Sequence, residues 1–193
     1  RAVSFGPGPV LLPLGLELRE GILFALARHE AGKPRILPGM TEVSKQRMLL
    51  ATRNAHKTQE VREILGAGWE IEDLTAHPDR PEVEETGETF EENAKLKALA
   101  ASAHYAGWVL ADDSGLEVDA LGGAPGVRSA RFAGEEASMA ANRALLREKL
   151  SKGQGSDWRG RFRCVLALAR HGVVLRTFSG VVEGSIASLE RGE

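Results

Sequence analysis

Two adjacent carboxylates, Asp112 and Asp113, stand directly after the short apolar run 108–111. Such a run predicts a buried strand, and ligands in open α/β sheets bind beyond the carboxyl ends of strands. Neighbouring side chains on extended backbone point to opposite sides, so we expect one aspartate to face a site and the other to hold a turn. Two such carboxylates repel each other unless a positive group lies nearby. The alternative is an Asp-Ser-Gly turn without chemistry.

A second set of polar residues, Thr52 to Lys57, lies between an expected strand and an expected helix. Helix N-termini present free N–H groups and a partial positive charge, which attract phosphate. Asn54 can cap the helix and donate to a ligand, and Lys57 adds a mobile positive charge. The glycine and lysine spacing of a Walker A loop is absent. The alternative is a capped helix that carries a solvated lysine.

Acidic residues crowd the stretch 84–92, before and within the start of a long expected helix. Acids in the first helical turn suit the helix dipole, which explains some of them structurally. Further along the same helix, Phe90, Asn93 and Lys97 share one face at positions i, i+3 and i+7. This combination predicts the wall of a site. The alternative is an amphipathic helix with a snorkelling lysine.

Together these segments predict a site for Mg²⁺ and a polyphosphate. The carboxylates of Glu84 and Asp113, with Asp112 as a further candidate, would repel a polyphosphate. Lys57 and Lys97 would attract it, so both kinds of group fit one pocket if a hard divalent cation joins them. Mg²⁺ binds one or two carboxylates with phosphate oxygens and water, and it can orient that water. The shortage of histidine ligands argues against zinc.

The elements that must position these residues follow from the apolar spacing. Strands are expected at 48–52, 69–74, 108–111, 116–121, 161–169 and 173–179. Helices are expected at 56–65, 89–106 and 135–152. Strands and helices alternate early and strands pair as a hairpin late, which indicates an α/β fold with a mixed central sheet flanked by helices. In residues 1–46 only 16–28 has the spacing of a helix, and this part is expected to be an extension or remnant of unknown function, ahead of one domain at 47–193.

Composition argues against several functional classes. The 193 residues carry a net charge of −2, which gives no basic field for a nucleic acid partner. No apolar stretch is long enough to span a bilayer, so no membrane partner is expected. The single cysteine, Cys164, lies in an apolar run, which predicts a buried, inert thiol and suits the reducing cytoplasm.

From Met48 onward the sequence resembles the inosine triphosphate pyrophosphatase family in four segments: ATRNAHKTQE, EETGETFEENAKLKA, ADDSGLEVDALGGAPGVRSARFAG and RFRCVLAL. This family hydrolyses the noncanonical purine nucleotides ITP, dITP and XTP to the monophosphate and pyrophosphate, with Mg²⁺, usually as a cytoplasmic homodimer. The resemblance therefore implies a nucleotide-pool sanitising enzyme. It also implies an elongated, two-lobed α/β domain with the nucleotide in a cleft. Arg53 departs mildly from the family, which often has a small residue there.

The resemblance also implies roles for individual residues. Asp113 is expected to be the general base and a metal ligand, Glu84 the other metal carboxylate, and Lys97 a catalytic residue that neutralises phosphate charge. The contacts to the triphosphate are expected to be Thr52, Arg53, Asn54, Ala55, His56, Lys57 and Ser114.

Family members continue past the part matching 181–193 into a Gly-Phe-Gly-Tyr-Asp-Pro motif and a Ser-His-Arg motif, which contact the purine. This sequence stops at Glu193, so we expect a domain lacking its C-terminal part, whose base preference the sequence does not specify. Two alternatives stay open: a nucleotide-binding but catalytically incompetent fragment, and a Maf-type nucleotide pyrophosphatase. The stretch EETGETFEENAKLKA argues against the Maf type. A third alternative is a purely structural α/β domain with solvated acids.

Overall fold

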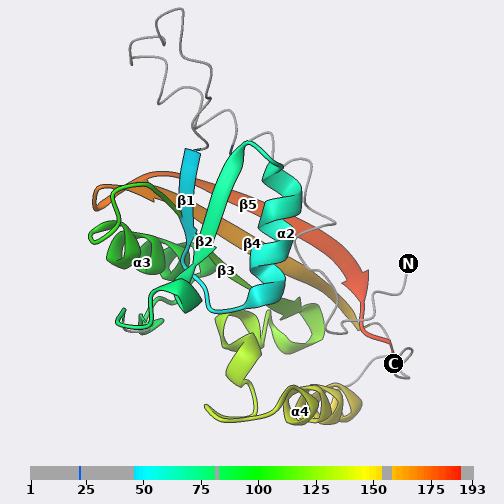
Figure 1. Cartoon of the computed structure of the whole chain (residues 1–193). Coiled ribbons are helices and arrows are strands. Elements are labelled where there is room, and N and C mark those ends of the chain that lie inside the picture. The colour runs from blue at the N-terminus through cyan, green and yellow to red at the C-terminus, as the bar shows by residue number, and fades with distance from the viewer. Residues whose placement is uncertain (1–21, 23–45, 81–82, 154–157, 188–193) are drawn as a thin grey trace, which may run out of the picture.

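Five strands form one mixed sheet in the computed structural model, which describes residues 22, 46–80, 83–153 and 158–187 (Figure 1). The order across the sheet is β2-β1-β3-β4-β5. β1 pairs in parallel with β2 and β3, whereas β3 with β4 and β4 with β5 are antiparallel. The strands are β1 (Gln46–Leu50), β2 (Trp69–Asp73), β3 (Trp108–Val118), β4 (Arg159–Arg170) and β5 (Val173–Ser185). The expected α/β class with a mixed sheet is confirmed.

Helices α2 (Ala55–Leu65) and α3 (Phe90–Ser102) pack on opposite faces of this sheet (Figure 1). Successive residues of a strand point to opposite faces, and two neighbours in β1 show the consequence. Leu50 belongs to the core cluster that contains Val61 of α2, and Leu49 belongs to the cluster that contains Ala94 of α3. Among the described residues, no helix is both long and apolar enough to cross a lipid bilayer.

Helix α4 (Met139–Lys152) forms a second, smaller packing unit at the far end of β3 (Figure 1). Its Leu146 and Leu150 are buried against Val118. The described residues also include three 3₁₀ segments: η2 (Leu74–Ala76), η3 (Asp119–Leu121) and η4 (Gly126–Arg131). η4 approaches β3 closely at Gly115, where a Cβ atom would lie only 2.4 Å from Ser129 Oγ and 2.6 Å from the Gly126 carbonyl oxygen. Glycine at this position therefore allows η4 to form one wall beside β3.

β3 is one continuous strand, and the expectation of two strands at 108–111 and 116–121 was wrong. β4 pairs with β3 from Val109 to Val118, so the sheet supplies hydrogen bonds to the backbone of the polar residues as well. Asp112, Asp113 and Ser114 consequently lie within a strand and do not form the expected turn. A strand holds them more rigidly than a turn would, and it keeps the two aspartates on opposite faces.

β1 ends early and leaves a notch in the sheet. It pairs with β3 only where Met48–Leu50 lies opposite Trp108–Leu110, and the last link runs from the Ala51 N–H to the Leu110 carbonyl oxygen at 2.8 Å. The chain then turns away toward α2, while β3 continues. Among the described residues, no strand flanks 111–114 on the side that β1 leaves. Side chains from both faces of β3 can therefore meet at this notch.

Cys164 is completely buried in β4, within the core cluster on the α2 face. Burial raises the pKa of its thiol above the ordinary value, and the nearby Asp112 carboxylate acts in the same direction. The expectation of a buried thiol is confirmed.

Because the Cys164 thiol is enclosed, a thiol reagent should label it only when the protein opens. We expect the labelling rate under native conditions to follow the unfolding equilibrium in urea. We also expect Cys164→Ala to lower the free energy of unfolding by about 1–2 kcal/mol, because it leaves a small cavity. Rapid labelling of the folded protein would contradict this reading.

The expected N-terminal extension, 1–46, lies outside the described residues except for Ile22 and Gln46. Ile22 is buried and belongs to the core cluster on the α2 face.

Candidate active site

A cavity of about 380 Å³ opens at the notch and lies between the end of β1, helix α3 and segment η4. Its polar lining brings together most of the side chains singled out above. The charged and hydroxyl residues that line it are Thr52, Arg53, Lys57, Arg80, Glu85, Lys97, His104, Asp112, Asp113 and Ser114. The apolar lining includes Val127 and Ala130 of η4. The cavity thus lies between the sheet, α3 and η4.

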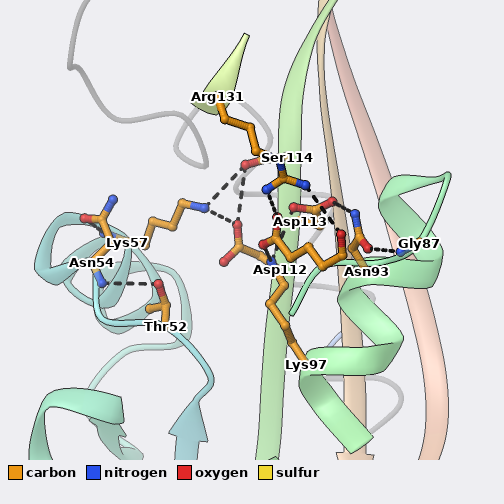
Figure 2. A network of polar contacts seen from close by, with 11 residues as sticks. Thr52, Asn54, Lys57, Gly87, Asn93, Lys97, Asp112, Asp113, Ser114 and Arg131 are labelled. Atoms are coloured by element: carbon orange, nitrogen blue, oxygen red, sulfur yellow. Dashed lines mark hydrogen bonds and ion pairs between the residues drawn. The ribbon is translucent and has the colours of Figure 1, made fainter. Parts of the chain in front are cut away.

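On one face of β3, Asp112 pairs with Lys57 from the first turn of α2 (Figure 2). The Lys57 Nζ lies 2.5 Å from Asp112 Oδ2 and 3.5 Å from Ser114 Oγ. Burial opposes the charge of both partners, but their mutual attraction prevails. It lowers the pKa of Asp112 and raises the pKa of Lys57. Asp112 is therefore an ionised carboxylate that holds Lys57 charged and aimed at the notch.

On the other face, Asp113 faces α3 and meets Asn93 and Lys97 (Figure 2). The Asn93 amide donates to Asp113 Oδ2 at 3.1 Å, and the Lys97 Nζ lies 3.3 Å from Asp113 Oδ1. Burial raises the pKa of Asp113, and the neighbouring Glu85 carboxylate adds to this, while Lys97 and Asn93 only partly offset it.

The environments of the two adjacent aspartates therefore shift their pKa values in opposite directions, down for Asp112 and up for Asp113. Opposed shifts in neighbouring carboxyls separate their chemical roles, because the more basic one accepts a proton more readily. This arrangement favours Asp113 as the base and Asp112 as a fixed charge. The alternation along the strand predicted opposite faces, and the structure confirms it.

The acidic loop before α3 contributes Glu85 to the cavity instead of the expected Glu84. Glu85 Oε1 lies 2.9 Å from Lys97 Nζ, and Glu85 Oε2 lies 3.2 Å from a guanidinium nitrogen of Arg131. Burial disfavours its charge, but Lys97 and Arg131 outweigh this and lower the pKa of Glu85. Glu84 is exposed and does not line the cavity, although it lines an adjoining, more open hollow that Glu85 also borders. We therefore replace Glu84 with Glu85 as the candidate metal carboxylate.

Arg131, at the end of η4, was not identified from the sequence as a site residue. Its guanidinium bonds both the side chain and the backbone carbonyl oxygen of Glu85, at 3.2 and 3.4 Å. The two residues are separated by 46 positions, so no local pattern could have linked them. The available signals were its place in the Gly/Pro-rich stretch and in the family-matching segment ADDSGLEVDALGGAPGVRSARFAG.

The expected phosphate loop, Thr52 to Lys57, is only partly directed into the cavity. Thr52, Arg53 and Lys57 line it, whereas Asn54, Ala55 and His56 are exposed and lie outside its lining. Asn54 caps α2 as expected, because its side-chain oxygen accepts the N–H groups of His56 at 3.0 Å and Lys57 at 3.4 Å.

Arg53 holds the 52–57 loop against the neighbouring segments. Its guanidinium donates to the carbonyl oxygens of Leu74 at 3.0 Å and Arg80 at 2.8 Å. Arg80 in turn donates to the carbonyl oxygen of His104 at 2.7 Å, just beyond α3. Of the loop's side chains, Lys57 has the charge and position best suited to a phosphate, whereas Arg53 is engaged in holding the loop.

The donor groups at the cavity fit a hard cation such as Mg²⁺. Glu85 Oε1 and Asp113 Oδ1 converge on one point, since the Lys97 ammonium lies within 3.3 Å of both. Two carboxylates are what Mg²⁺ uses when phosphate oxygens and water complete its shell. Among the described residues there is no cluster of three or more histidine, cysteine, aspartate or glutamate side chains arranged to hold a metal.

The model of the Ham1 family matches residues 48–193. The chain is 50% identical over 147 residues to a dITP/XTP pyrophosphatase of Exiguobacterium sibiricum, across 76% of this chain and 74% of that protein. It is 47% identical over 148 residues to a dITP/XTP pyrophosphatase of Geobacter sulfurreducens, with the same shares of each chain.

Solved structures of Ham1 proteins have a similar fold. A HAM1 protein from Coxiella burnetii superposes with a TM-score of 0.70 at 38% identity, covering 76% of each chain. The Ham1 protein of Staphylococcus aureus superposes with a TM-score of 0.68, also at 38% identity, over 77% of this chain and 76% of that one.

Proposed function

The chain belongs to the Ham1 family, and on this basis we propose that it hydrolyses the noncanonical purine nucleotides ITP, dITP and XTP to the monophosphate and pyrophosphate. The observation that carries the proposal is the convergence of Glu85 and Asp113 on one point at the notch, beside the buried Lys57–Asp112 pair. Carboxylates and lysines in one cavity suit a triphosphate that arrives with a divalent cation. The family match supports this activity over the Maf-type alternative.

In the proposed reaction, the Asp113 carboxylate takes a proton from a water molecule that attacks the α-phosphorus. The bond from that phosphorus to the bridging oxygen breaks, and pyrophosphate leaves. Lys97 and Lys57 offset the charge on the phosphates, and Asp112 keeps Lys57 aimed at them. Glu85 and Asp113 would hold Mg²⁺, which when bound neutralises phosphate charge and lowers the pKa of water.

The choice between Glu84 and Glu85 can be tested with matched variants, since the two residues are adjacent and chemically identical. We expect Glu85→Gln to raise the Mg²⁺ concentration needed for half-maximal activity by roughly 10- to 100-fold, the scale seen when groups that support a metal are removed. Glu84→Gln should leave this concentration unchanged, because Glu84 is exposed and lies outside the cavity. A magnesium titration of both variants measures this. If Glu84→Gln raised the required Mg²⁺ concentration and Glu85→Gln did not, Glu84 would again be the candidate metal carboxylate.

The function itself is tested by pyrophosphate release from ITP, XTP, GTP and ATP, with Mg²⁺ and with EDTA. We expect release that requires the metal and is faster for ITP and XTP than for ATP. Metal-dependent release without such a preference would mean that this chain catalyses the hydrolysis but does not select the base. Nucleotide binding without release would support the alternative of a catalytically incompetent fragment.

The resemblance also supports a cytoplasmic homodimer without nucleic acid or membrane partners. The net charge of −2 agrees with the absence of a polyanion partner. Light scattering coupled to size exclusion measures the oligomeric state, and a monomer at micromolar concentration would refute the dimer.

A further inference from the structure

Asn93 is a buried polar residue that the proposed reaction does not use. It lies within α3 and is 0% exposed, although asparagine is a poor helix former. Both ends of its amide are engaged: the nitrogen donates to Asp113 Oδ2 at 3.1 Å, and the oxygen accepts the Gly87 N–H at 2.8 Å (Figure 2). The orientation of the amide follows from chemistry, because a backbone N–H must donate and a carboxylate must accept.

The partner of Asn93 on the loop lies two residues after Glu85. Asn93 thus joins the strand that carries Asp113 to the loop that carries Glu85. The contact is close: a Cβ on Gly87 would lie 2.7 Å from Asn93 Oδ1 and 2.6 Å from Glu92 Cβ. Only glycine lets the loop backbone approach this near, so the loop and the helix fit each other at this point.

Lys97 also contacts both carboxylates, at 2.9 and 3.3 Å, but it cannot fix their separation once a cation binds. Its ammonium lies at the point on which the carboxylates converge, where a divalent ion would repel it. The neutral amide of Asn93 carries no charge to be repelled. It also approaches Asp113 through Oδ2, which leaves Oδ1 for other partners.

We propose that Asn93 is a positioning residue that sets the separation of Glu85 and Asp113, and so prepares the site for a divalent cation. The role rests on the proposed function, because the cation would serve the proposed hydrolysis. Its test does not depend on hydrolysis, because it measures cation binding alone. Asn93 does not line the cavity, so its proposed role needs no contact with substrate or metal. It acts by holding Asp113 directly and the Glu85 loop through Gly87.

The test measures the affinity of the full chain for Mn²⁺ in the absence of nucleotide. Electron paramagnetic resonance reports the fraction of Mn²⁺ that is bound. Asn93→Leu keeps the branching at Cγ and removes both hydrogen bonds, and Gly87→Ala disturbs the other end of the same contact. We expect each to weaken Mn²⁺ binding by roughly 10- to 100-fold, as for other outer groups of metal sites. Ser102→Ala is the control, because it removes a hydrogen bond from a buried hydroxyl in the same helix that does not line the cavity and contacts neither carboxylate. It should keep the wild-type affinity.

A folded Asn93→Leu protein with wild-type Mn²⁺ affinity would overturn the proposal, as would a wild-type chain that binds no Mn²⁺. If Asn93→Leu does not fold, Gly87→Ala decides the question. Because the readout is binding and not turnover, the two proposals can fail separately. Loss of Mn²⁺ affinity on changing Asn93, in a protein that releases no pyrophosphate, would refute the proposed activity and retain the positioning role.

Discussion

Asp113→Asn is expected to reduce pyrophosphate release from ITP by at least about 10³-fold, within the range for losing a general base. Asparagine has almost the same shape as aspartate but cannot accept the proton, and it is a weaker ligand for a cation. The folded state should tolerate the change, since burial already disfavours the Asp113 charge and raises the pKa of this carboxyl. We therefore expect an unchanged or slightly higher melting temperature together with the loss of turnover.

The matched control for this variant is Asp119→Asn. Asp119 is an exposed carboxylate in η3 that pairs with Arg161, away from the cavity lining. It should retain the wild-type rate, because an exposed ion pair contributes little to stability and none of its atoms lies in the site. Retention of activity by a folded Asp113→Asn protein would remove Asp113 as the base.

Lys97→Ala is expected to lower kcat by about 10²- to 10³-fold with a much smaller change in KM, as when one group that stabilises transition-state charge is removed. The Lys97 ammonium is largely buried and touches both Glu85 and Asp113. Negative charge on the phosphate oxygens is redistributed as the bond to pyrophosphate breaks, so an ammonium group beside these oxygens acts chiefly on the transition state. Steady-state kinetics with ITP at saturating Mg²⁺ separates the two constants.

Lys95→Ala serves as the control on the same helix. Lys95 forms an exposed i, i+4 pair with Glu91 and does not line the cavity, so its loss should leave both constants unchanged. Equal effects of the two lysine variants would indicate a general electrostatic contribution. An unchanged kcat in Lys97→Ala would exclude this residue from the mechanism.

The periodicity of the sequence was sufficient for most elements, because local spacing decides which residues a helix or strand can bury. The helix expected at 56–65 corresponds to α2, with Asn54 as its cap, and the expected hairpin corresponds to β4 and β5. The spacing of apolar residues wrongly predicted that the strand ends at 111, where the polar residues begin. A polar stretch can continue a strand when a neighbouring strand supplies hydrogen bonds to its backbone. Here β4 is that neighbouring strand.

For the site, the sequence by itself determined the chemical inventory: two adjacent aspartates on opposite faces, and lysines on two helices that flank them. It also determined the family through long matching segments. Tertiary structure alone decided that Glu85, and not Glu84, faces Asp113. It also decided that Arg131 reaches Glu85, and that Arg53 bonds carbonyl groups of the neighbouring loop. The physical reason is that two adjacent loop residues of the same type cannot be told apart from the sequence. Which of them points inward depends on contacts between segments that are distant in the chain.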